Sequence, residues 1–267
     1  WYRDGQTVYP YLEPPLDLNV ENVLQSGYYT DLYYELKLNY ERRFGDHGVG
    51  GLFVFNRQKK NLNADFPYLN EAWVGRATYD YAYKYLLEVN ISYTGSESFS
   101  PKNRFGFFPS AALGWVVSEE GFFKKNVPWM NLLKFRYSDG IVGSDKSADR
   151  WIYINDFTKD NAGKIREDKI ANSSARWETA RKRDLGVEIG LFNSFLKLTV
   201  DIFDEKRKDM LLTPRSTTFL IGNSFKNLNL GKLEKRGIEV EAEINKTTSY
   251  LLNYHFKGMF GYNDNRI

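Results

Sequence analysis

Apolar and polar residues alternate along most of this chain, and this alternation limits its possible folds more than any other feature. In residues 184–191, leucine, valine or isoleucine occupies every second position, and aspartate, glutamate or glycine lies between them. The pattern recurs in residues 34–41, 87–93, 133–137, 196–202 and 238–244. A period of two places the two sets of side chains on opposite faces of a β-strand. We therefore predict an all-β chain of antiparallel strands, each with one apolar and one polar face.

The segments between the predicted strands alternate, without exception, between short and long. Short segments lie at 45–48 and 193–194, and long ones lie at 96–103, 141–182 and 208–229. In an up-and-down sheet, all the long segments then share one end. Outer-membrane barrels have this arrangement, with short turns toward the periplasm and long loops outside. The pattern predicts an antiparallel up-and-down transmembrane β-barrel in the bacterial outer membrane.

Composition agrees with this class and excludes others. Aromatic residues make up 16% of the chain, which suits strands and membrane interfaces. A mean hydropathy of −0.54 excludes a transmembrane helix but not a barrel, whose strands are apolar only at every second position. The 37 Lys and Arg nearly balance the 34 Asp and Glu, so nucleic acid is not expected as a partner. Without cysteine, the chain has no thiolate nucleophile and no zinc–sulfur site.

The number of predicted strands is about ten or eleven, which could close a modest barrel. The chain begins at Trp1 without an initiator methionine or a signal region, and it stops in a polar run. We therefore expect residues 1–267 to be one partial barrel domain, a section of a larger wall. Two alternatives stay open: a self-contained outer-membrane barrel acting as porin, adhesin or enzyme, and a soluble β-sandwich.

The stretch Asn103–Phe123, NRFGFFPSAALGWVVSEEGFF, is the most distinctive segment. We place its strand at 105–118, its 96–103 side outside the cell and its 119–129 side in the periplasm. Residues 84–123, 128–144, 182–212 and 229–244, in this order, closely resemble the C-terminal barrel region of SusC/RagA-type TonB-linked outer-membrane receptors.

The resemblance implies a barrel of about 22 strands, of which this chain supplies a part. It also implies an N-terminal plug and a TonB-contacting segment, and we recognise neither in these residues. Receptors of this type import glycans or oligopeptides with energy from TonB, and a SusD-like surface lipoprotein forms a lid over them. The implied function is nutrient uptake without a cofactor, with an oligosaccharide or oligopeptide as ligand.

Three aromatic residues in the longest predicted loop, Trp151, Tyr153 and Trp177, are the candidate ligand or partner contacts. Aromatic rings can stack on sugar rings or contact a lid protein. Rings of this kind can equally anchor a loop, and the sequence favours that second reading.

Catalytic and metal sites are not expected. His47 and His255 are too few and too far apart for a metal site, and the spacing of Asp156, Asp160 and Asn161 matches no calcium loop. No glycine-flanked nucleophile motif occurs. Glu239, Glu241 and Glu243 share one strand face and are interpreted as part of a hydrated lumen rather than as catalytic acids.

Two further sets of residues point to membrane contact. Lys59, Lys60 and the run Arg181–Arg183 could bind anionic outer-membrane lipid, although solubility at strand ends explains them about as well. Aromatic residues near strand ends favour an interfacial girdle over simple core packing. They are Tyr79, Tyr81, Trp115 and Trp129.

Overall fold

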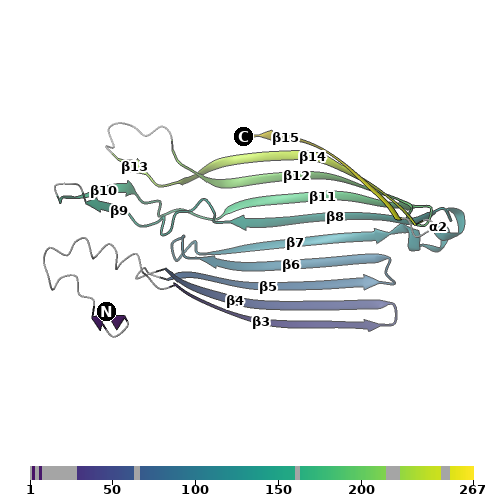
Figure 1. Cartoon of the computed structure of the whole chain (residues 1–267), viewed down its shortest axis with the longest axis horizontal. Coiled ribbons are helices and arrows are strands. Elements are labelled where there is room, and N and C mark those ends of the chain that lie inside the picture. Colours follow the sequence, from purple (N-terminus) through teal and green to yellow (C-terminus); the bar gives the residue numbers. More distant parts are fainter. Residues whose placement is uncertain are drawn as a thin grey trace.

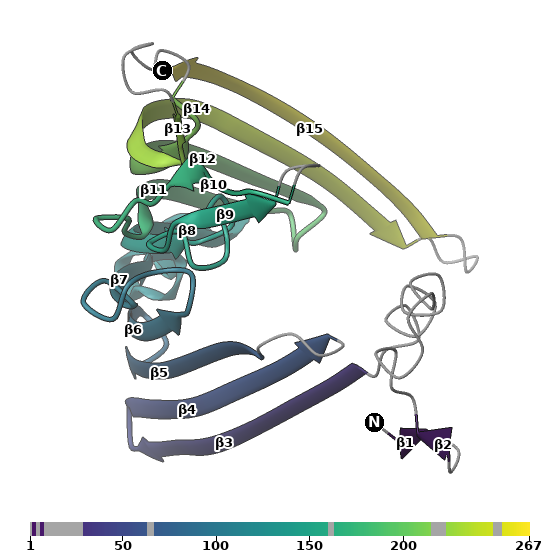
Figure 2. The same cartoon turned by 90° about the vertical axis from the view of Figure 1, so that its left-hand side faces the viewer.

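The computed structural model describes residues 2–3, 6–7, 29–62, 67–159, 163–214, 223–247 and 253–267. Ten long strands of this part form one antiparallel sheet, the wall (Figure 1). In order across the wall they are β3 (Tyr29–Phe44), β4 (His47–Leu62), β5 (Tyr68–Tyr81), β6 (Tyr85–Ser96), β7 (Phe105–Val116), β8 (Met130–Ser144), β11 (Glu178–Leu191), β12 (Leu196–Leu212), β14 (Leu228–Thr247) and β15 (Asn253–Arg266). The wall curves into an open arc with β3 and β15 at its edges (Figure 2). The predicted all-β antiparallel class is confirmed.

The register of the wall keeps its two faces chemically distinct. Leu36 of β3 lies opposite Phe55 of β4, Phe55 lies opposite Trp73 of β5, and Trp73 lies opposite Tyr93 of β6. Residues that pair across strands share a face, so these side chains form a continuous apolar face. The positions between them, such as Glu35, form the polar face. The sequence alternation therefore extends across these four strands.

Both faces of the wall are open. Leu113 and Ile202 on the apolar face are 56% and 54% exposed, and in the described part of the chain no second sheet packs against them. A β-sandwich would bury such residues between two sheets, so the sandwich reading is wrong. The buried hydrophobic residues of the described chain lie instead in connections or near strand ends: Phe99, Val117, Ile152, Ala175, Trp177 and Leu211.

Several strands are longer than the hydrophobic pattern indicates. β4 continues to Leu62 and β5 begins at Tyr68, so most of the polar connection expected at 57–70 is strand. β8 and β11 likewise extend into the segment 141–182, which was expected to lack regular structure. Backbone pairing continues past the point where apolar residues stop, and side-chain periodicity cannot detect such strand ends.

The connections gather at two ends of the wall. The loop end carries connections such as 97–104 and 145–177, which includes β9 (Asp156–Lys159) and β10 (Ile165–Ile170). β13 (Ser224–Phe225), between β12 and β14, pairs with β10 in a small second sheet. A further two-stranded hairpin, β1 (Tyr2–Arg3) and β2 (Gln6–Thr7), precedes the wall. In Figure 1 the loop end is on the left.

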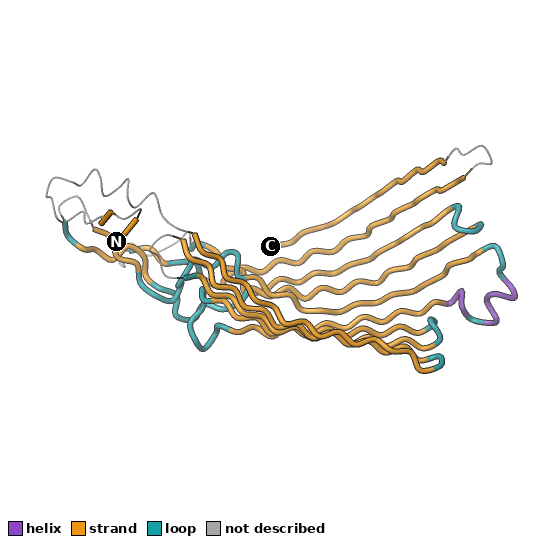
Figure 3. The backbone as a smooth tube through the Cα atoms, turned by 60° about the horizontal axis from the view of Figure 1, so that its bottom comes forward, coloured by secondary structure: helices purple, strands orange, loops and turns teal. Residues whose placement is uncertain are grey.

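The opposite, turn end is not uniformly short. Residues 117–129 were expected to form a short return, but they are more numerous than residues 97–104 at the loop end. They fold into a 3-10 helix, η1 (Val117–Glu119), and a helix, α2 (Gly121–Asn126), shown in purple in Figure 3. In the described chain no helix has the length and apolar character needed to cross a membrane.

One carboxylate ties the helical connection to the wall. Glu120 accepts hydrogen bonds from the Tyr85 hydroxyl at 2.7 Å, the Lys84 ammonium at 3.1 Å and the Trp115 indole N–H at 3.3 Å. Hydrogen bonds from Tyr85 and then from Lys84 lower the pKa of Glu120, and the Trp115 bond adds to them. Tyr85 and Trp115 belong to an aromatic row at the turn end of the apolar face: Tyr79, Tyr81, Tyr85, Trp115 and Phe135.

Candidate functional site

Three connections fold together at the loop end into one unit, which we call the loop cluster. It comprises residues 97–104, 145–159, 163–177, 213–214 and 223–227, together with the adjoining end of β12. No hydrophobic alternation marks these residues, so the packing between them was not predicted.

The loop cluster has a small hydrophobic core. Phe99 and Ile152 are fully buried and Trp177 is 9% exposed, while Ala175 and Leu211 complete the buried set. The Trp177 ring lies 5.3 Å, centroid to centroid, from the ring of Phe99. Its indole N–H donates to the backbone carbonyl of Arg104 at 3.0 Å. The core joins the first and second loops to the end of β12.

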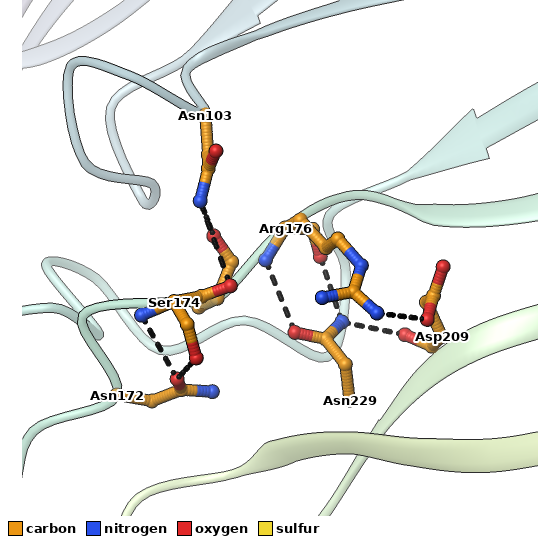
Figure 4. A network of polar contacts seen from close by, with 7 residues as sticks. Asn103, Asn172, Ser174, Arg176, Asp209 and Asn229 are labelled. Atoms are coloured by element: carbon orange, nitrogen blue, oxygen red, sulfur yellow. Dashed lines mark hydrogen bonds and ion pairs between the residues drawn. The ribbon is translucent and has the colours of Figure 1, made fainter.

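Asparagine side chains satisfy the backbone of the irregular segment 172–177 (Figure 4). Asn103 donates to the carbonyl of Ala175 at 3.0 Å. Asn229 accepts from the backbone N–H of Arg176 at 3.1 Å and donates to its carbonyl at 2.8 Å. It also donates to the carbonyl of Asp209 at 2.6 Å. These amides replace the sheet partners that the segment lacks.

Asp209 completes this network on the wall side. Its carboxylate lies 2.6 Å from the Arg176 guanidinium. Asn172 accepts from both the N–H and the hydroxyl of Ser174, at 3.2 and 2.9 Å, and donates to the carbonyl of Asn227 at 2.9 Å. The second and third loops are thereby held together.

Lys226 is a cation inside the loop cluster. It is 2% exposed, and its ammonium lies 2.8 Å from the Asp156 carboxylate and 3.3 Å from the carbonyl of Trp151. A buried ammonium requires such partners, since desolvation is otherwise costly. Lys226 thus links the third loop to the second, next to the predicted contact residue Trp151.

Arg150 holds the loop cluster to the first strands of the wall. Its guanidinium lies 3.1 Å from the Glu97 carboxylate and donates to the carbonyl of Pro67 at 2.9 Å. It also lies over the rings of Tyr68 and Trp151, at 3.8 and 4.2 Å from their centroids. Neither Arg150 nor Lys226 was predicted from the sequence, because an isolated cation in a loop carries no periodic signal.

The three candidate contact residues differ in position. The Trp177 ring is inside the core. Trp151 and Tyr153 are half-buried, and Trp151 adopts a left-handed backbone with φ of 51°. Contact with a ligand stays a prediction for all three, of which Trp151 and Tyr153 are the less buried residues.

The residues considered for metal binding have protein partners. A ring nitrogen of His47 lies 2.8 Å from the Tyr79 hydroxyl, and one of His255 lies 2.6 Å from the Asn245 side-chain oxygen. Asp156 pairs with Lys226. Asp160 and Asn161 lie outside the described residues. Within the described ranges, no three His, Cys, Asp or Glu side chains gather as a metal site would require.

The polar face of the wall is a surface of paired charges. The Arg136 guanidinium lies 2.6 Å from Asp201 and 3.2 Å from Glu188. In the glutamate row, Glu241 lies 2.7 Å from Lys257, and Glu243 lies 3.6 Å from His255. The glutamate row is thus part of this surface of polar contacts.

The family model for "TonB dependent receptor-like, beta-barrel" matches residues 1–267. The chain belongs to this family. TonB-dependent receptors lie in the outer membrane and are transporters rather than enzymes, so the apolar face contacts lipid and the polar face lines the barrel interior.

Individual receptors agree with the family assignment. TonB-dependent receptor P3 of Formosa agariphila is 30% identical, over 89% of this chain and 27% of its own length. TonB-dependent receptor SusC of Bacteroides thetaiotaomicron is 30% identical over 63% of this chain and 18% of its own length. This chain thus spans about a quarter of the curated receptors that it matches. The predicted resemblance to SusC/RagA-type receptors is confirmed.

Solved receptor structures share the fold. The RagAB peptide transporter matches with a TM-score of 0.75 at 16% identity, over 89% of this chain and 30% of that chain. The siderophore receptor PirA from Pseudomonas aeruginosa matches with a TM-score of 0.58 at 11% identity, over 88% of this chain and 43% of that chain. Because the sequence identities are this low, these two matches show a shared fold and nothing more.

Proposed function

We propose that this chain forms part of the wall of an outer-membrane importer for an oligomeric nutrient, either a glycan or an oligopeptide. The observation that carries the proposal is the loop cluster, a folded unit at one end of an amphipathic wall. The similarity to SusC and to the RagAB peptide transporter supports nutrient uptake. The loop end faces outside in this proposal, as long barrel loops generally do.

The remaining parts of the importer are also proposals. A larger wall of about 22 strands would close the barrel, with β3 and β15 each pairing with a further strand. Energy would come from TonB through a plug and a TonB-contacting segment that these residues do not supply. A SusD-like lipoprotein would cover the loop end, consistent with the similarity to RagAB.

Ligand contact is proposed at Trp151 and Tyr153. Both residues are half-buried, so each retains accessible surface. Arg150 stacks on Trp151 and is itself held by Glu97, so the tryptophan is supported from within the loop cluster. A fixed aromatic ring binds a sugar or peptide with little further loss of side-chain entropy.

The test uses the full-length receptor that contains this chain, purified from outer membranes in detergent. Binding of an α-glucan oligosaccharide series and of a tryptic peptide mixture is measured by native mass spectrometry. We expect the double substitution Trp151→Ala/Tyr153→Ala to weaken binding of one probe class about tenfold, as loss of two stacking contacts would. Phe122→Ala, an exposed ring on α2 at the turn end, is the control and should bind as wild type.

Three outcomes would contradict parts of the proposal. Unchanged binding in the double variant would remove Trp151 and Tyr153 from the site. Binding of neither probe class would contradict uptake of an oligomeric nutrient. A closed, heat-modifiable barrel with a native polypeptide mass of 31.2 kDa would support a self-contained porin or adhesin instead.

A further inference from the structure

On the second half of the wall, the apolar face ends abruptly in two rows of charged residues. Each row runs across neighbouring strands in direct register. The first row, from β8 to β15, is Asp139, Arg183, Asp204, Arg236 and Asp264. The second, one step nearer the loop end, is Arg181, Lys206, Glu234 and Arg266.

These charges lie on the lipid-facing side. Along β11, Leu185, Arg183 and Arg181 are alternate residues, and alternate residues share a face. The same holds on β12 for Ile202 and Lys206. The rows therefore directly continue the apolar belt toward the loop end, at the level where a bilayer changes from hydrocarbon to headgroups.

A hollow of about 430 Å³ lies at this boundary. Its apolar part is formed by Tyr137, Leu185 and Ile202, and its charged part by Arg183, Lys206 and Arg236, with Asp204 as a carboxylate among them. Asp184 also borders the hollow, but it alternates onto the polar face, where its carboxylate lies 3.7 Å from Arg136. One side of the hollow is thus apolar and the other is cationic.

The carboxylates of the rows do not balance the cations around the hollow. Asp139 pairs with both Arg181 and Arg183, at 2.7 and 3.3 Å. Asp204 pairs with Arg236 at 2.9 Å, and Glu234 with Lys206 at 3.5 Å. Asp264 pairs with Arg266 at 3.3 Å, so the four carboxylates of the two rows face five cations.

The register also places two cations together. Arg181 lies directly opposite Lys206 on the same face. Like charges in this position are unfavourable unless an anion lies between them. Both side chains are well exposed, at 52% and 40%, and can turn toward a bound group.

We propose that this surface binds a phosphorylated outer-leaflet lipid, with its phosphate at Arg181, Arg183 and Lys206 and an acyl chain along Tyr137, Leu185 and Ile202. Arginine and lysine bind phosphate through charge-assisted hydrogen bonds, and the adjoining hollow receives the chain. The proposal uses the orientation with the loop end outside but does not depend on which nutrient is imported.

The experiment uses the full-length receptor in detergent and titrates it with lipid A that carries one phosphate, read out by native mass spectrometry. We expect Arg181→Gln/Lys206→Gln to weaken binding about tenfold. Lys182→Gln/Arg207→Gln is the matched control, because it removes two charges from the same strands on the polar face, where both pair with Glu205. Their exposures, 54% and 46%, are similar to those of the test pair.

Additional arms separate the phosphate from the chain. Removing the phosphate from the lipid should weaken binding to the wild type at least as much as the double substitution weakens binding of the intact lipid. Inorganic phosphate at a concentration equal to that of the lipid should not displace it. Equal binding by both lipids, full displacement by phosphate, or an equal loss in the control would overturn the proposal. Lys206→Gln alone, expected to lose about threefold, is measured if the double variant lacks heat-modifiable gel mobility.

Discussion

The wall and the loop cluster are stabilised in different ways. The wall leaves its apolar side chains exposed for lipid and depends on the pairing of neighbouring strands along the sheet. The loop cluster instead buries Phe99, Ile152 and Trp177 and satisfies irregular backbone with amide side chains. One is built like a membrane protein and the other like a small soluble domain.

Mutations should act differently in the two regions. A side chain on the wall face has few protein neighbours, so its loss leaves no cavity. A side chain in the loop cluster has neighbours from several loops, so its loss affects all of them. We therefore expect substitutions of the same residue type to have unequal effects in the two regions.

The largest effect is expected for Trp177→Ala. Loss of the ring and of the hydrogen bond to Arg104 should destabilise the loop cluster by about 3–5 kcal/mol, as for other buried aromatic residues. Hydrogen exchange in residues 97–104 and 171–177 of the full-length receptor measures this as a lower free energy of local opening. Trp115→Ala, which removes the same ring from the lipid face, is the control, and equal effects of the two would contradict the comparison.

A smaller effect is expected for Gly143→Ala at the border between the regions. A β-carbon at Gly143 would lie 2.0 Å from the Phe108 ring, which itself packs 5.3 Å from the Trp177 ring. The ring must move, at a cost of about 2 kcal/mol. In contrast, Gly75 on the wall has no neighbour within 4 Å of such a carbon. Gly75→Ala should leave exchange unchanged, and loss of protection in that variant alone would argue against the packing described.

Asn229→Ala tests the amide network. Its hydrogen bonds to Arg176 and Asp209 are partly accessible to water, so we expect a loss of about 1 kcal/mol in the free energy of opening of residues 172–177. Asn131→Ala is the matched change at the turn end, where Asn131 bonds Ser194 at 2.7 and 3.0 Å. It should increase exchange at 192–195 only. If it also opened the loop cluster, the two ends would not be independent.

The same comparison explains what could be predicted from sequence. The apolar face of β11 was readable because Leu185, Val187 and Ile189 repeat at the period of a strand. The charged end of the same strand, Glu178–Arg183, could not be predicted, because both of its faces are largely polar and the period of two is lost.

The loop residues were predicted only in part, for a related reason. The aromatic residues of the longest loop were noticed by type, but burial separates Trp177 from Trp151, and burial depends on contacts distant in sequence. Trp177 meets Phe99 through a contact that no local pattern encodes. The charged rows were noticed only as the run Arg181–Arg183. The register shows that Arg181 and Arg183 lie on the same face as Leu185, whereas Lys182 lies on the opposite face.

The smallest effect is a pH dependence at the turn end. Because hydrogen bonds from Tyr85, Lys84 and Trp115 lower the pKa of Glu120 in the folded protein, its stabilising contribution is present above the pKa of the unfolded chain. The contribution is lost as pH falls through the lower, folded pKa. Hydrogen exchange at residues 117–126 should therefore increase on acidification. Glu120→Gln should remove the difference between neutral and acid pH in this segment. If the variant retained the wild-type pH dependence, another group would be responsible for it.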